Sequence, residues 1–162
     1  MNKVNTYFNK MEDLLASIAG LLMLFSMFST ILEVFMRYFF NHSFVWIQEY
    51  NEYILLYIPF LAGAWLLRLN GHVAIDLIDN FIKSKSKRVL SGITAVIGII
   101  VTAIIVYASI LVTIHAYESN LTSTTILQTP QFYVYIIIPI GTLFMLIEFC
   151  RQFIQISKNP SN

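Results

Sequence analysis

The sequence has few charged residues for its length. Asp, Glu, Lys and Arg make up 12% of its 162 residues, whereas a soluble domain carries about 25%. Hydrophobic residues make up 57% of the chain, and the mean hydropathy is +0.71. A chain with so little charge cannot coat a water-soluble surface, so the composition predicts an integral membrane protein that lipid covers.

Other missing features exclude whole classes of function. Cys150 is the only cysteine, so no disulfide can form within the chain. The formal net charge of +1 provides no field to attract nucleic acid, and no nucleic-acid-binding motif is present. Neither a P-loop nor a G-x-S-x-G motif occurs. The sequence therefore predicts no nucleic-acid partner, no catalytic residues and no enzyme.

The three histidines do not form a pattern that a metal or a haem requires. A haem within the membrane needs axial ligands at matching depth on facing helices. His42 and His72 are expected in connections on opposite sides of the membrane, and only His115 lies near a predicted span. No cysteine and histidine cluster suits zinc. The sequence predicts no cofactor and no metal site.

Long apolar runs dominate what is present. About 20 apolar residues cross the roughly 30 Å of hydrocarbon in a bilayer. We predict an all-α integral membrane protein that forms one domain over residues 1–162, with the first apolar run retained as a helix. The predicted transmembrane helices cover roughly residues 14–36, 53–69, 89–116 and 132–150.

The basic residues predict the orientation of these helices, because cytoplasmic segments carry an excess of Lys and Arg. All of them except Arg37 lie in the N-terminal segment, in the connection between the second and third helices, or in the C-terminal segment. Both termini are therefore predicted to be cytoplasmic. An even number of spans agrees with this orientation.

The connection between the second and third helices has an amphipathic pattern over residues 73–83. On a helical wheel its apolar residues cover one side, and Asp76, Asp79, Asn80 and Lys83 cluster on the other. This pattern predicts a short helix that lies in the membrane interface. A docking surface for a partner is the alternative interpretation.

Glu33 is the carboxylate placed deepest in a predicted span. A carboxylate within a membrane suggests a functional site. However, Arg37 follows four residues later, and this spacing favours an ion pair on one helix face. Ser26, Ser29 and Thr30 extend the same face and predict that it contacts protein. A structural ion pair is the favoured interpretation, and a proton or ion relay is the alternative.

Two further patterns concern contacts with neighbours. Glu49 and Glu52 are expected at the start of the second helix, where unpaired backbone amides favour acidic residues. They could instead meet Arg37 or a protein that approaches from outside. In the third helix, small residues repeat at a spacing that lets another helix approach closely. They are Thr94, Gly98 and Thr102.

Several segments, taken in order, resemble one family. Residues 37–49 (RYFFNHSFVWIQE) resemble R-Y-x-F-x-x-S-x-x-W-x-x-E, and residues 71–76 (GHVAID) resemble G-x-H-V-x-V-D. Thr129-Pro130, Phe132, Tyr135 and Pro139-Ile140-Gly141 resemble T-P-x-W-x-x-Y-x-x-x-P-x-G, with Phe132 where Trp is commoner. Gly63-Ala64 matches a further short step, and Gln48 stands where an acid is often found. Together these segments resemble the small, DctQ-like membrane subunit of the tripartite ATP-independent periplasmic (TRAP) transporters.

This resemblance implies a function that composition alone does not show. In the family, a periplasmic binding protein captures an organic acid, such as a dicarboxylate or sialic acid. A large membrane subunit then carries it inward with an elevator-like movement that a sodium gradient drives. The small subunit binds the large one in the bacterial inner membrane, enlarges its scaffold and helps to dock the binding protein.

The resemblance also implies positions for single residues. Arg37, Trp46, Glu49 and Glu52 would lie at the periplasmic side, where docking could occur. His72 and Asp76 would lie at the cytoplasmic side and fix the interfacial helix.

Two other functions compete with this one. A self-sufficient four-helix exporter would use Glu33 as its proton site and would work as a homodimer. A membrane anchor of a redox enzyme would bind haem, which the histidine positions disfavour.

Overall fold

The computed structural model describes residues 3–78, 84–125 and 127–158, with side chains described for 5–69, 89–125 and 127–157. Its helices are α1 (Lys3–Phe40), α2 (Val45–Ile78), α3 (Ser84–Glu118), α4 (Gln131–Tyr135) and α5 (Ile137–Lys158). Four stretches are long and apolar enough to cross a membrane. The prediction of an all-α protein with four transmembrane helices is confirmed.

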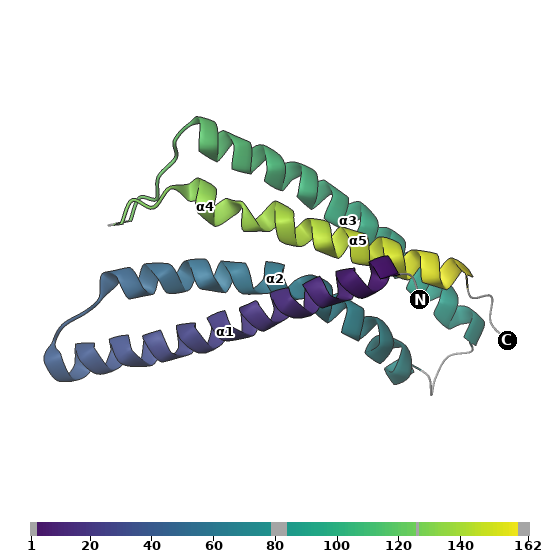
Figure 1. Ribbon diagram of the computed structural model, residues 1–162, viewed down its shortest axis with the longest axis horizontal. Helices are drawn as coiled ribbons and strands as arrows, with labels where there is room; N and C mark the ends of the chain where they lie inside the picture. The colour runs from purple at the N-terminus through teal and green to yellow at the C-terminus, as the bar shows by residue number, and fades with distance from the viewer. Residues whose placement is uncertain (1–2, 79–83, 126, 159–162) are drawn as a thin grey trace.

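The helices form two hairpins (Figure 1). α1 packs on α2, α3 packs on α4 and α5, and the two hairpins meet along α2 and α5. The two chain ends lie at the same end of the molecule. This agrees with an even number of spans, while the side of the membrane that the ends occupy stays a prediction.

The helices are longer than the predicted spans. α1 has 38 residues, which corresponds to about 57 Å of helix, so it extends well beyond a hydrocarbon core of roughly 30 Å. α2 begins at Val45, ahead of the predicted start, and its backbone stays helical through residues 73–78. The rest of the predicted interfacial helix, residues 79–83, lies outside the described residues. Its position in the interface stays a prediction.

The fourth span is made of two helical pieces because of Pro139. Proline has no backbone N–H and its ring clashes with the carbonyl four residues earlier, which here belongs to Tyr135. The helix is interrupted at Ile136, between α4 and α5. Pro59 lies inside α2, which bends along its length in Figure 1.

Glycines allow α5 to approach its neighbours closely. A Cβ added to Gly141 would lie 2.4 Å from the backbone oxygen of Phe60 in α2. A Cβ added to Gly98 of α3 would lie 2.4 Å from the ring of Phe149. Small residues therefore set the distances between these helices, as is usual in lipid.

Only part of the predicted small-residue repeat of α3 is packed in the structure. Gly98 contacts α5, and Thr102 is buried one turn later, with its hydroxyl donating to the Gly98 carbonyl at 2.6 Å. Thr94 is exposed, and its hydroxyl donates to the Leu90 carbonyl. The close contact thus involves the later part of the repeat.

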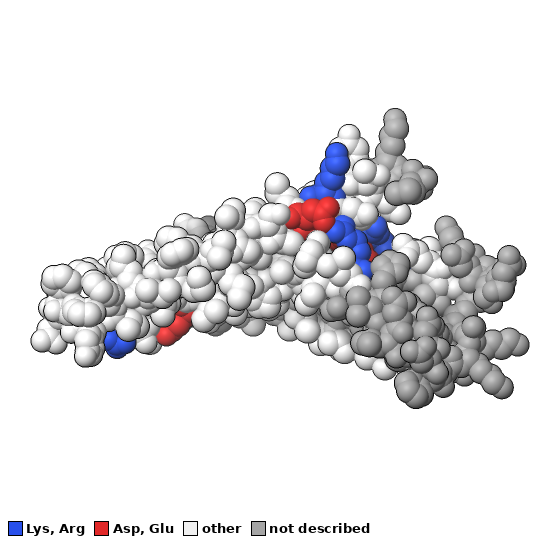
Figure 2. All heavy atoms as spheres, turned by 90° about the horizontal axis from the view of Figure 1, so that it is seen from below, with Lys and Arg blue, Asp and Glu red and all other residues white. Residues whose placement is uncertain are grey.

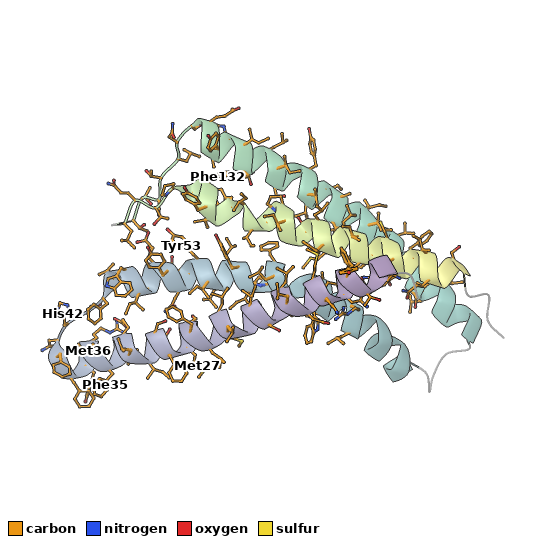
Figure 3. All side chains as sticks on the ribbon, viewed as in Figure 1. Met27, Phe35, Met36, His42, Tyr53 and Phe132 are labelled. Atoms are coloured by element: carbon orange, nitrogen blue, oxygen red, sulfur yellow. The ribbon has the colours of Figure 1, made fainter. Side chains whose placement is uncertain are left out.

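Large apolar side chains cover the outside of the molecule. Phe28 is 65% exposed, and Phe35 points away from α2 in Figure 3. In water such a surface would be strongly unfavourable, because apolar area costs about 25 cal/mol per Å² when it is exposed. Lipid or another membrane protein must cover it.

Candidate functional site

The charged residues of the four spans gather near the two ends of the molecule. Residues 14–32, 53–67, 89–114 and 119–147 contain no Asp, Glu, Lys or Arg. We call these four segments the charge-free middle. Figure 2 shows charged atoms on this face in two separate places, with uncharged surface between them.

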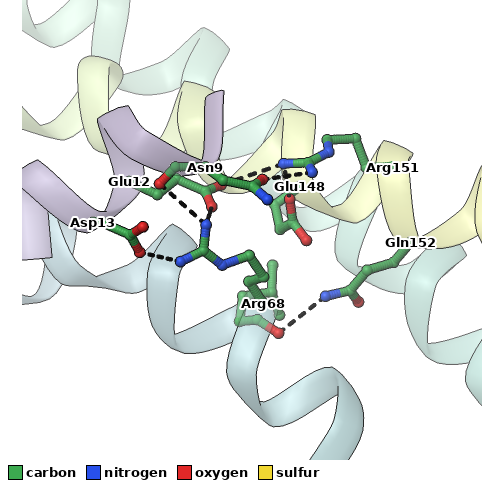
Figure 4. A network of polar contacts seen from close by, with 8 residues as sticks. Asn9, Glu12, Asp13, Arg68, Glu148, Arg151 and Gln152 are labelled. Carbon is green, nitrogen blue, oxygen red and sulfur yellow. Dashed lines mark hydrogen bonds and ion pairs between the residues drawn. The ribbon is translucent and has the colours of Figure 1, made fainter. Parts of the chain in front are cut away.

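At the end where the chain termini lie, two arginines and three carboxylates form a cluster (Figure 4). Arg68 of α2 pairs with Glu12 of α1 at 2.9 Å, and it also pairs with Asp13. It donates a further hydrogen bond to the backbone oxygen of Asn9 at 3.1 Å. One guanidinium therefore contacts α1 through three residues of the same turn.

The second arginine of the cluster joins α5 to the same turn of α1. Arg151 donates to Glu148 at 2.8 Å and to the Asn9 side chain at 2.7 Å, and it lies 3.8 Å from Glu12. Its guanidinium also lies over the ring of Phe8, 5.2 Å from the centroid. We call this group the terminal-end cluster. It consists of Asn9, Glu12, Asp13, Arg68, Glu148 and Arg151.

The cluster is buried, so its carboxylates depend on their ion pairs for stability. The Glu12 side chain is fully buried and Glu148 is 3% exposed. Burying a carboxylate costs several kcal/mol unless it is paired and hydrogen-bonded. Because Glu12 lies between Arg68 and Arg151, it holds α1 against both α2 and α5. Gln152 adds a hydrogen bond from α5 to the Leu67 carbonyl of α2 at 3.0 Å.

The sequence did not predict this cluster. Arg68 and Arg151 look like basic residues that only flank spans, although their side chains are only 20% and 16% exposed in the structure. A usable signal was present, because Glu148 interrupts an apolar run three residues before Arg151. Glu12 carries no comparable signal.

At the opposite end, the predicted pair between Glu33 and Arg37 is present. The two side chains lie 3.4 Å apart, and Ser43 donates to the same carboxylate at 3.1 Å. Arg37 is 60% exposed and Glu33 is 11% exposed. The contacts of the Glu33 carboxylate therefore lie within its own hairpin.

The predicted polar face of α1 contacts α2, as expected for a face that meets protein. Ser29 donates to the side-chain oxygen of Asn51 at 2.9 Å, and the Asn51 amide donates to Thr30 at 3.0 Å. Ser26 is buried on the same face. Asn51, which the sequence analysis did not single out, connects this face to α2.

Glu49 is buried rather than available at the surface. It is 4% exposed and accepts hydrogen bonds from Tyr53, at 2.9 Å, and from Thr125 in the connection between α3 and α4. Neither Glu49 nor Glu52 lies in the first turn of α2, which begins at Val45. The prediction that they occupy a helix N-terminus is wrong, because α2 begins at Val45, about two turns before the predicted start at residue 53.

The other predicted site residues fall in two situations. Glu52 and Trp46 are exposed, the latter by 50%. The side chains of His72 and Asp76 lie outside the described residues. Within the described residues, no three His, Cys, Asp or Glu side chains gather as metal ligands would.

Comparison with known proteins assigns a family. Residues 26–159 match the family described as "Tripartite ATP-independent periplasmic transporters, DctQ component". The chain is 30% identical over 115 residues to the "C4-dicarboxylate TRAP transporter small permease protein DctQ" of Rhodobacter capsulatus. The match covers 70% of this chain and 48% of that protein, so the chain spans about half the length of the relative. Glu12 and Asp13 precede the region that matches the family.

Proposed function

Because this chain belongs to the DctQ component family of the tripartite ATP-independent periplasmic transporters, we propose that it scaffolds the large membrane subunit of such a transporter. It is a multi-pass protein of the inner membrane. In the proposed role it binds no substrate and catalyses no reaction. It holds a larger subunit in place and helps to position the periplasmic binding protein.

The charge-free middle is the observation that carries this proposal. A transporter that binds a carboxylate substrate places convergent polar groups near the membrane midplane, commonly at broken helices. Here the charged residues lie toward the helix ends, and the hydroxyls of Thr102, Thr113 and Thr142 donate to carbonyls of their own helices. Such an interior suits a structural scaffold better than a pathway for a substrate.

The end with Glu33 and Arg37 is the proposed periplasmic end, where the binding protein docks. Arg37, Trp46 and Glu52 are exposed there and offer charge and an aromatic side chain to a partner. Glu49 has a different role in this proposal, because its carboxylate holds the connection between α3 and α4 through Thr125. At the opposite, cytoplasmic end, we propose that His72 and Asp76 fix the interfacial helix.

The transported compound is proposed to be an organic acid, such as a dicarboxylate or sialic acid. The relative from Rhodobacter capsulatus is described as part of a C4-dicarboxylate transporter. Recognition of the acid and coupling to sodium would both belong to the other subunits, since the charge-free middle offers neither ion a charged partner in this chain.

Purification and transport assays together test this function. The tagged chain, extracted gently from its native membrane, is expected to bring with it a large polytopic membrane protein. Cells that lack this chain are expected to lose uptake of the organic acid and to regain it when the gene is restored. Recovery of the chain alone, with uptake unchanged in its absence, would contradict the proposal.

The competing exporter is disfavoured by the contacts of Glu33. A proton site needs a carboxylate that can exchange its partner, and this one is held by Arg37 and Ser43 within one hairpin. Under the scaffold proposal, Glu33→Gln lowers assembly and transport together. Lost transport by a fully assembled variant would instead support a proton site.

A further inference from the structure

A groove lies between α1 and α2 near the terminal-end cluster. It has a volume of about 460 Å³, and residues of these two helices alone line it. α1 contributes small side chains over two turns, and α2 contributes Ile58, Ala62 and Trp65. The α1 lining consists of Asp13, Ala16, Ser17, Ala19, Gly20 and Met23.

Two of the small residues in this groove, Ser17 and Gly20, are exposed. Nothing lies within 4 Å of a Cβ added to Gly20. Elsewhere on α1 the exposed side chains are large, such as Leu21 at 67% and Phe25 at 60%. Small residues in a membrane let helices approach closely, whereas lipid chains gain nothing particular from them. The groove therefore has the form of a helix contact.

The charge at the end of the groove indicates what the contact requires. The terminal-end cluster brings three carboxylates together with two guanidiniums. Asp13 is its exposed carboxylate, at 56%, and it also lines the groove. Lys10 is exposed and forms none of the ion pairs among the described residues.

We propose that this groove receives a transmembrane helix of the large membrane subunit, with a basic side chain that pairs with Asp13. The inference rests on the proposed function and names its contact surface. The helix backbone lies against Ala16 and Gly20, and the basic side chain pairs with the exposed carboxylate of Asp13. An anionic lipid headgroup does not fit the same place, because Asp13 would repel it.

Two matched glycine variants test the groove. Gly20→Leu fills it, and Gly92→Leu adds the same bulk to α3, where a Cβ also meets nothing within 4 Å. At neither position does the new Cβ meet another atom of this chain within 4 Å. Because overpacking a close contact is unfavourable, Gly20→Leu is expected to lower recovery of the large subunit by about tenfold. Gly92→Leu is expected to leave recovery unchanged, and equal recovery with both variants would overturn the proposal.

Asp13→Asn tests the charge. The amide can still accept a hydrogen bond from Arg68, so the cluster is retained while the exposed negative charge of Asp13 is removed. Recovery of the large subunit is expected to fall and to lose part of its sensitivity to salt. Unchanged recovery at every salt concentration would overturn the ion pair.

Crosslinking identifies the occupant directly. A photoreactive phenylalanine analogue at Met23, which lines the groove, is expected to attach to the large subunit. The same analogue at Phe25, which does not line it, serves as the control. Attachment at Met23 to lipid alone, or to a second copy of this chain, would overturn the inference. In that case co-purification of the wild-type chain with a large subunit would still leave the proposed function standing.

Discussion

Replacing Arg68 with methionine is expected to destabilise the protein strongly, because Arg68 is the nearer of the two cations around Glu12. Methionine keeps much of the side-chain volume but removes the charge, the ion pair with Glu12 and the hydrogen bonds to Asp13 and Asn9. Glu12 is then left fully buried, with Arg151 at 3.8 Å as its remaining cation. Asp13 is 56% exposed and can turn toward solvent, so its loss matters less.

The magnitude follows from burial. Removing one partner of a buried ion pair costs about 3–5 kcal/mol, because the other charge stays buried without compensation. Arg37→Met provides a matched control, since the same substitution breaks the pair with Glu33. Arg37 is 60% exposed, and breaking such a pair costs about 1 kcal/mol or less. The two variants should therefore differ by at least 2 kcal/mol, which is about thirtyfold in the equilibrium constant.

Reversible unfolding of the purified protein in mixed micelles measures this difference. The free energy of unfolding is obtained by titration with a denaturing detergent and followed by the fluorescence of Trp46 and Trp65, both in α2. Equal losses for the two variants would refute the argument that burial makes the terminal-end cluster important. A larger loss for Arg37→Met would refute it more strongly.

Three further predictions concern packing, the connection after α3 and docking. Gly141→Val is expected to lower the free energy of unfolding by about 1–3 kcal/mol, because its Cβ meets the backbone oxygen of Phe60; unchanged unfolding would contradict the close approach of α2 and α5. Thr125→Ala removes a hydrogen bond to Glu49, so amides of residues 119–130 are expected to exchange hydrogen faster, while those of α1 stay as protected as before. Glu52→Lys is expected to weaken uptake of the organic acid at low concentrations of binding protein and to leave the membrane complex intact; normal uptake would exclude this residue from docking.

Local patterns in the sequence predicted the parts of the structure that local physics determines. The four spans follow from apolar length, and the pair of Glu33 with Arg37 follows from one helical turn. The contact of Gly98 with α5 follows from small residues at helical spacing, although the sequence could not name the neighbour.

The parts of the structure that the sequence did not predict depend on contacts between segments that are far apart along the chain. The terminal-end cluster joins Asn9 to Arg151, across 142 positions of the chain. Glu49 and Thr125 are 76 positions apart. No helical periodicity reports which hairpin lies beside which, so each carboxylate could be judged only by its neighbours in sequence. The start of α2 was misplaced for a related reason, because its first turns are too polar to register as part of an apolar run.

The charge-free middle also determines how the protein responds to the membrane potential. Moving one elementary charge through a potential of 100 mV involves about 2.3 kcal/mol of electrical work. The four segments of the charge-free middle carry no Asp, Glu, Lys or Arg, so small shifts of these helices move no such charge through the centre of the field. The voltage across the membrane therefore does little work on this chain. In the proposed scaffold role, it can stay still as a fixed frame while the same voltage acts on ions that move through the proposed large subunit.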